Sequence, residues 1–189
     1  MVKNFAYLID NLGFIPNGNR TYFLGRSQPP FFSMMVGVLA EMEGDSVFQA
    51  YLPQLEKEYA FWMDGAATLS ADKPAHRRVG RFADGKSLET IRTADILPVD
   101  LNALLYHLEW TIAQTYLSQG QKDIADTWIE KAKKRVTAVQ KYMWNAKSGF
   151  FMDYDFVKGE MTYIPSLAGV FPLFFRMATR EEALLGAKN

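Results

Sequence analysis

The chain has 189 residues, about the length of one domain, and is 49% hydrophobic and 14% aromatic, which excludes a disordered chain. Its 21 basic and 21 acidic residues balance. This balance argues against electrostatic binding to nucleic acid or to an anionic membrane. Cysteine is absent, which excludes disulfides, thiolate metal sites and cysteine nucleophiles.

The sequence offers no targeting or membrane-spanning signal. The richest apolar run, residues 29–40, is shorter than the ~20 residues that cross a bilayer. The first residues lack the apolar stretch and cleavage site of a signal peptide. The compartment therefore stays open between periplasm and cytoplasm.

Most of the first third has the 3.6-residue apolar period of helices. Residues 2–12 are predicted as a helix, with Gly13 placed to end it. Pro29-Pro30 is expected to open a second helix that stops near residue 44. We expect Asp45 to cap a short helix to about residue 52, and Pro53 to begin a separate helix through residues 62–63.

The next segment, residues 65–95, has a different pattern. Arg78 to Phe82 is predicted as a short strand. Asp84-Gly85 is a tight-turn signal that joins it to a second strand.

Helical patterning resumes after Pro98, with Asp100 as the expected N-cap. A long helix is predicted over residues 122–142. Residues 150–155 alternate as a strand of a small hairpin, and an apolar helix should follow over residues 167–177. A capping box at Thr179–Glu182 opens a last short helix. The total is seven or eight helices with two minor strand pairs.

Little in the chain indicates a metal or a phosphate site. The two histidines, His76 and His107, are interpreted as ordinary structural residues. No glycine-rich phosphate loop and no nucleophile elbow is present in the sequence. We therefore expect no cofactor and no metal.

The unusual stretch is the loop from Gly13 to Pro30. It concentrates amides, guanidinium groups, aromatic rings and hydroxyls ahead of a helix start. Planar amides and guanidinium forks form paired hydrogen bonds with neighbouring sugar hydroxyls. Carbohydrate binding is one interpretation. The other is a well-connected loop whose asparagines bond their own backbone.

Two charged patches have plain interpretations. Asp153 and Asp155 point to one face of the predicted strand, at a spacing of ~7 Å that overlaps the separation in inverting glycosidases. Solvated turn residues are the preferred interpretation. Arg77, Arg78, Arg81 and Lys86 are expected to be a solvated basic hairpin rather than an anion site.

The loop carries a family resemblance. It strongly resembles the α,α-trehalases in two runs, Ile15-Pro16-Asn17-Gly18-Asn19-Arg20-Thr21-Tyr22 and Arg26-Ser27-Gln28-Pro29-Pro30. The resemblance continues through residues 52–65, 98–102, 142–155 and 171–173, and so covers nearly the whole chain.

The resemblance implies a fold and an activity. The fold would be all-α, an incomplete (α/α) toroid of six helical hairpins, here seven or eight helices with small β-hairpins. The activity would be hydrolysis of α,α-trehalose to glucose with inversion, without a metal or organic cofactor. Asn17, Arg26 and Gln28 match positions that line the sugar subsite in this family. Asn102 and the hairpin at residues 153–155 match regions near the barrel mouth.

The chain also departs from the family. Trehalases carry the general acid in a Ser-Gly-Trp-Asp motif and the base far downstream, and none of the four tryptophans here lies between Gly and Asp. No catalytic residue is therefore assigned. We expect a partial chain, with a family segment missing between Leu88 and Glu89. The alternatives are a non-catalytic carbohydrate-binding remnant and a helical scaffold completed by a partner chain.

Overall fold

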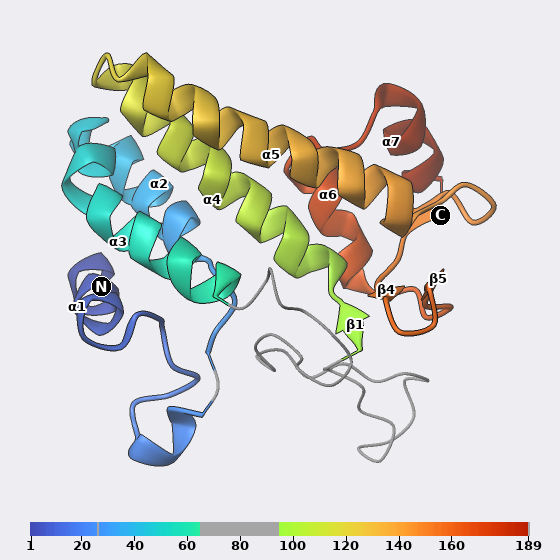
Figure 1. Ribbon diagram of the computed structural model, residues 1–189, viewed down its shortest axis with the longest axis horizontal. Helices are drawn as coiled ribbons and strands as arrows, with labels where there is room; N and C mark the ends of the chain where they lie inside the picture. Colours follow the sequence, from blue (N-terminus) through green and yellow to red (C-terminus); the bar gives the residue numbers. More distant parts are fainter. Residues whose placement is uncertain (26, 65–94, 189) are drawn as a thin grey trace.

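Two long antiparallel helices, α4 (Val99–Ser118) and α5 (Lys122–Met143), form the middle of the molecule (Figure 1). The computed structural model describes residues 1–25, 27–64 and 95–188. Helices α1 (Val2–Leu12), α2 (Phe32–Glu43) and α3 (Ser46–Met63) pack on one side of this pair. At its other end lie the 3₁₀-helix η4 (Leu167–Val170), α6 (Phe171–Phe174) and α7 (Arg180–Gly186).

Short strands join the helices at the start of α4. Strands β1 (Ile96–Leu97), β4 (Tyr154–Asp155) and β5 (Glu160–Met161) form an antiparallel sheet in the order β1-β4-β5. Strand β2 (Trp144–Asn145) pairs with β3 (Phe150–Phe151) directly after α5. Together they tie the beginning of α4 to the end of α5.

The core has two parts that share α4. One lies among α1, α2, α3 and the second half of α4, around Ile9, Phe32, Leu55 and Leu108. The other surrounds the first half of α4, the end of α5 and the C-terminal elements, around Leu104, Val139 and Phe151. Because both parts of the core pack on α4, this helix is buried on several faces.

Several predicted elements are confirmed. Helix α1 ends at Gly13, which adopts φ 82° as a left-handed C-cap. Helix α5 starts at Lys122 and runs one residue beyond the predicted end. The capping box of α7 is complete, because Thr179 accepts from the Glu182 backbone and Glu182 accepts from the Thr179 backbone.

The predicted division at Pro53 is wrong. Helix α3 continues through this residue. Pro53 lies on the exposed face, so the carbonyl four residues earlier, at exposed Gln49, can be solvated. Leu52 and Leu55 remain on the buried face on either side. Asp45 is the N-cap residue, but its side chain makes no capping hydrogen bond.

Three other boundaries differ from expectation. Pro29 and Pro30 precede α2 rather than opening it. Asp100 lies in the first turn of α4, whose N-cap is Pro98. Instead of one helix over residues 167–177, the chain forms η4 and a one-turn α6.

The segment over residues 167–177 packs closely on β3. A Cβ on Gly169 would lie 2.3 Å from the Phe151 carbonyl oxygen, so η4 passes directly against β3. Arg176 then takes φ 57°, which ends the helical path. The strand predicted at residues 78–82, its Asp84-Gly85 turn, His76 and the basic patch lie outside the described residues.

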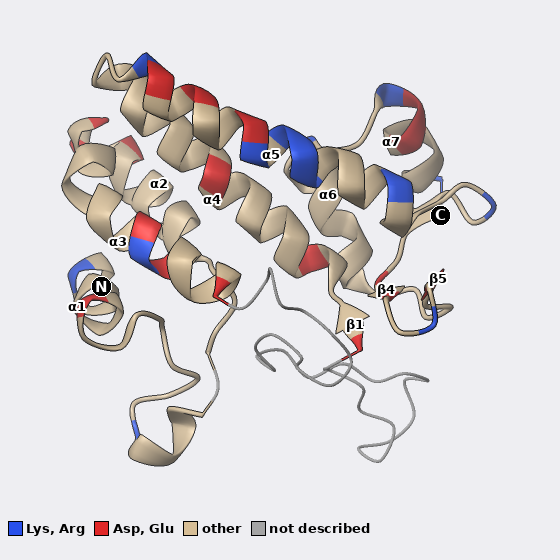
Figure 2. Ribbon diagram, viewed as in Figure 1, with Lys and Arg blue, Asp and Glu red and all other residues tan. Residues whose placement is uncertain are grey.

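Charge is spread over the surface. Acidic and basic segments alternate along α5 (Figure 2), and Lys133 pairs with Glu130 at 3.0 Å on its exposed face. Among the helices that the structure describes, none combines the length and apolarity needed to span a bilayer.

Glu58 on α3 is an exception to this surface placement of charge. It is 1% exposed, and neither carboxyl oxygen has a hydrogen-bond partner. It lies between Leu55 and Trp62 on the buried face of the helix. Burial raises the pKa of Glu58 from 4.5 to about 8, so the group is neutral at neutral pH.

Glu58 should make the protein less stable as the pH rises. Between pH 4.5 and about 8 the folded state keeps a proton that the unfolded state releases. The free energy of unfolding should therefore fall by at most about 1.4 kcal/mol per pH unit within that window. Below and above it, both states carry the same charge and the effect stops changing.

Urea unfolding of Glu58→Gln at pH 5 and pH 8 tests this. The variant should lose the part of the pH dependence that belongs to Glu58. Glu43→Gln is the matched control, because Glu43 is exposed at the end of α2. A pH slope that is the same in Glu58→Gln and the wild type would contradict the prediction.

Candidate functional site

The predicted site residues Asn17 and Gln28 lie opposite each other in the loop between α1 and α2. Gln28 Nε2 donates to Asn17 Oδ1 at 2.8 Å. The pairing of Pro16 with Ser27, and a hydrogen bond from the Gln28 backbone to the Ile15 carbonyl at 2.7 Å, hold the two strands of the loop together. The predicted partner Arg26 lies outside the described residues.

The tip of this loop has its own support. Residues Thr21–Phe23 form a 3₁₀ turn, η1, and the Tyr22 and Phe23 rings lie 4.4 Å apart. A Cβ on Gly18 would lie 2.5 Å from the Phe23 ring, so a larger residue there would have to displace that ring. At the base, Phe14 stacks on Phe61 of α3 at 4.4 Å. The loop is thereby fixed to the helices.

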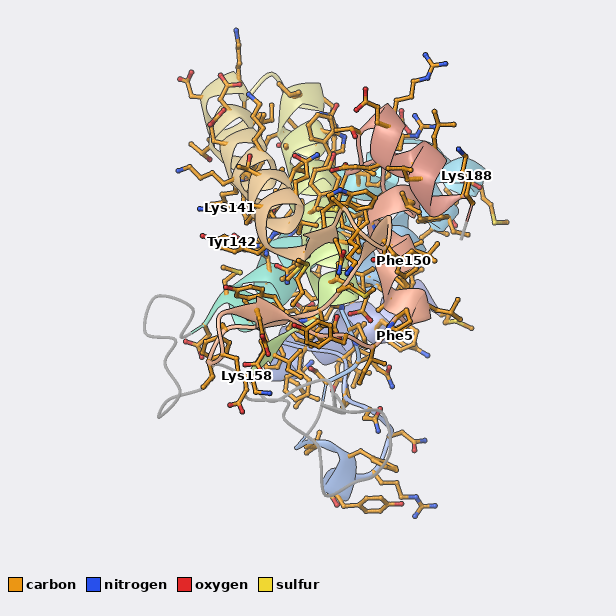
Figure 3. All side chains as sticks on the ribbon, turned by 90° about the vertical axis from the view of Figure 1, so that its right-hand side faces the viewer. Phe5, Lys141, Tyr142, Phe150, Lys158 and Lys188 are labelled. Atoms are coloured by element: carbon orange, nitrogen blue, oxygen red, sulfur yellow. The ribbon has the colours of Figure 1, made fainter. Side chains whose placement is uncertain are left out.

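A pocket of about 540 Å³ opens between this loop and helices α1 and α2. Phe5, Leu8 and Met35 supply apolar walls, and Asn17, Asn19 and Gln28 supply amides. Figure 3 shows Phe5 beside the loop that extends from the helical body. The volume is typical of small-ligand sites. Because Asn17 Oδ1 already accepts from Gln28, the Asn17 amide nitrogen and Gln28 Oε1 are the groups left for a ligand.

The predicted mouth residues are held by backbone contacts. Asp153 Oδ1 accepts from the Val99 backbone at 2.8 Å, at the N-terminus of α4. Asp155 Oδ1 accepts from the Lys158 backbone at 3.0 Å. Asp155 is 4% exposed, so the interpretation of this residue as a solvated turn residue is wrong. Asp155 lies in β4, where it pairs with Ile96 of β1, and this pairing removes Asp155 from solvent.

His107 has the structural role expected of it. The Ser33 hydroxyl lies 2.9 Å from Nδ1, and the ring packs on Phe175 at 4.8 Å. Burial lowers the pKa of His107 to about 4, so the imidazole is neutral at neutral pH.

Sequence reasoning missed a buried polar network beneath the mouth. Arg135 of α5 donates to both Glu109 carboxylate oxygens, at 2.9 and 2.7 Å, and to Asn102 Oδ1 at 2.9 Å. Asn102 in turn donates to the Pro98 carbonyl. Burial, and then the nearby Glu109 carboxylate, raise the pKa of Tyr59 to about 12. The sequence does hold one signal for this network, because Glu109 is a charged residue among the apolar residues of α4.

Within the described ranges no group of three or more His, Cys, Asp or Glu could hold a metal ion. The Asn17 pocket itself offers hydrogen bonding by amides between apolar walls.

A sequence model of the Trehalase family matches residues 1–85 and 75–188. The chain belongs to the trehalase family. A periplasmic trehalase of Xanthomonas campestris pv. campestris (strain B100) is 38% identical over 240 residues, covering 97% of this chain and 42% of the relative. One of Salmonella agona (strain SL483) is 36% identical over 241 residues, with the same coverage. The chain thus spans less than half the length of these relatives.

Solved structures of a trehalase and of a mannosylglycerate hydrolase share the fold. The neutral trehalase Nth1 of Saccharomyces cerevisiae superposes with a TM-score of 0.80 at 21% identity, over 100% of this chain and 48% of that one. A GH63 mannosylglycerate hydrolase of Thermus thermophilus, in complex with glucose, gives 0.64 at 17% identity over 91% and 53%. The fold is therefore part of an (α/α) toroid, as predicted.

The Arg135 network should contribute strongly to the free energy of unfolding, because it joins α4 and α5 through a buried ion pair. Arg135→Met leaves the Glu109 carboxylate, 1% exposed, without its cation. Breaking such a buried pair should lower the free energy of unfolding by about 3–5 kcal/mol.

The double variant Glu109→Leu/Arg135→Met should lose clearly less, because no unpaired charge remains buried. Urea unfolding of both single variants and the double variant measures the coupling. If the double variant loses the sum of the two single losses, the pair is not coupled and the prediction is wrong.

Proposed function

We propose that this chain is the sugar-binding part of an enzyme that hydrolyses α,α-trehalose to two glucose molecules with inversion. The observation that carries the proposal is the Asn17–Gln28 amide pair at a pocket of about 540 Å³ with apolar walls. Trehalose presents vicinal hydroxyls that such amides can bind in pairs. The curated relatives that the chain matches are named periplasmic trehalases.

The roles within the pocket follow from donor and acceptor chemistry. We assign sugar binding to Asn17, Arg26 and Gln28. The Asn17 amide nitrogen donates to a hydroxyl, and Gln28 Oε1 accepts from one. A guanidinium at position 26 would add a fork of donors. Membership of the trehalase family supports these assignments.

The 189-residue chain itself is proposed to bind without turnover. Inversion requires an acid and a base roughly 6.5–9.5 Å apart, on opposite faces of the scissile bond. Neither family motif that carries these carboxylates is present in the sequence. Losing one such group typically slows the reaction by about 10²–10⁴-fold.

We also propose that a family segment is missing between Leu88 and Glu89. The family model matches the chain in two pieces, residues 1–85 and 75–188, which overlap over residues 75–85 shortly before the proposed junction. The aligned length of 240 positions exceeds the 189 residues of the chain, so the relative carries additional residues. The aligned length supports additional residues in the relative, and the two family matches support a break close to the proposed junction.

Titration calorimetry with trehalose, beside a glucose-release assay, tests the binding role. The chain should bind trehalose saturably and release no glucose. Asn17→Ala should weaken binding by roughly twofold to tenfold, since a hydrogen bond to a hydroxyl contributes about 0.5–1.5 kcal/mol. Asn11→Ala is the control, because Asn11 is exposed on α1 and its amide donates to the Tyr7 carbonyl of the same helix. Glucose release would refute the absence of turnover, and no binding would refute the site.

Intact mass spectrometry of the protein purified from its natural source tests the missing segment. We expect a mass well above the 21.5 kDa of this sequence. A measured mass equal to that of 189 residues would overturn the proposal, independently of the binding result.

A further inference from the structure

A second groove lies at the opposite end of α2 from the Asn17 pocket. It has a volume of about 410 Å³ and runs between the start of α3 and the second half of α4. Asp45, Phe48, Trp110, Gln114 and Ser118 are among its lining residues. The 12 residues of α2 rise about 18 Å, so the two sites are separate. The volume again fits a small ligand.

Trp110 gives the groove a flat apolar surface. It is 41% exposed, whereas Trp62 and Trp128 are 6% and 8% exposed. Its ring stacks on Tyr106 with centroids 6.4 Å apart and an interplanar angle of 25°. This contact orients the indole before any ligand arrives, so little side-chain entropy is lost on binding.

The polar groups of the groove have capacity left for a ligand. Asp45 occupies the N-cap position of α3, yet its carboxylate makes no capping hydrogen bond. Gln114 lies one turn after Trp110 on α4 and is exposed. The Ser118 hydroxyl donates to the Thr115 carbonyl at 2.7 Å, which leaves its oxygen as an acceptor.

We propose that this groove binds a pyranose sugar. The indole of Trp110 covers the apolar C–H face of the ring, and Asp45 and Gln114 bind neighbouring hydroxyls. A carboxylate only accepts and an amide both donates and accepts, which matches vicinal hydroxyls. A helix packed in the groove would instead remove water from Asp45 and Gln114. The hydrogen bonds that these side chains make to water would then be lost without replacement.

The proposal does not rest on trehalose hydrolysis. The groove shares no residue with the Asn17 pocket. The competing ligand is a small organic cation, which an indole and a carboxylate can hold by cation–π and ionic contacts. A cation would use Trp110 and Asp45 but not Gln114.

Trp110 provides the readout. Acrylamide quenching of tryptophan fluorescence in the 189-residue chain should fall saturably as D-glucose is added. The reason is that glucose covers Trp110, which is more exposed than Trp62 and Trp128. Gln114→Ala keeps the reporter and should weaken glucose binding by roughly threefold to tenfold. Leu117→Ala is the matched control, since Leu117 is 39% exposed on the same helix but does not line the groove.

Two further variants separate the possible outcomes. Asn17→Ala should leave glucose protection unchanged, whatever it does to trehalose binding in the other pocket. Trp110→Ala should remove one glucose-binding event in titration calorimetry while thermal unfolding stays near that of the wild type. The proposal is overturned if glucose gives no protection, if Asn17→Ala abolishes it, or if tetramethylammonium protects Trp110 and glucose does not.

Discussion

The guanidinium of Arg135 joins three helices at the middle of the bundle. It binds Glu109 through two nitrogens and Asn102 through a third contact, and it reaches the Met63 sulfur at 3.5 Å. One side chain thus links α3, α4 and α5 in a region where neighbouring contacts are apolar. Because Asn102 is held from one side, its other end can bond the Pro98 carbonyl and fix the first turn of α4. The entry to that helix is therefore set from inside the bundle.

The second buried carboxyl, Glu58, solves the same physical problem in the opposite way. Glu109 stays beside a cation that offsets its desolvation, whereas burial of Glu58 without partners favours its neutral form. The two groups lie on facing helices, and their difference comes from the presence of one arginine. Stability at neutral pH consequently depends on charge pairing at one place and on protonation at the other.

Local signals in the sequence predicted the elements whose ends are set locally. Gly13 and the capping box at Thr179 act within one turn, so the chain alone determines them. The predicted helix boundary at Pro53 was wrong because this residue lies on the exposed face of α3, where a proline is tolerated. That position depends on how the helix packs. The recognised motif named Asn17 and Gln28 as site residues, but their contact depends on the pairing of Pro16 with Ser27, which the motif does not specify. The Arg135–Glu109 pair could not be predicted, because 26 residues separate partners that only helix packing brings together.

Four of the described carboxyl groups, Glu58, Glu109, Asp153 and Asp155, bear on the proposed division between sugar binding and chemistry. A general acid needs a raised pKa and contact with the substrate. Glu58 has the raised pKa, but it lines neither the Asn17 pocket nor the Trp110 groove. Glu109 is committed to Arg135, and Asp153 and Asp155 hold backbone N–H groups at the ends of local elements. Moving Glu109, Asp153 or Asp155 into catalysis would remove a contact that the fold uses. An enzyme built on this scaffold would accordingly take its acid and base from residues that have no structural task, which is the arrangement expected if the family segment beyond Leu88 supplies the acid.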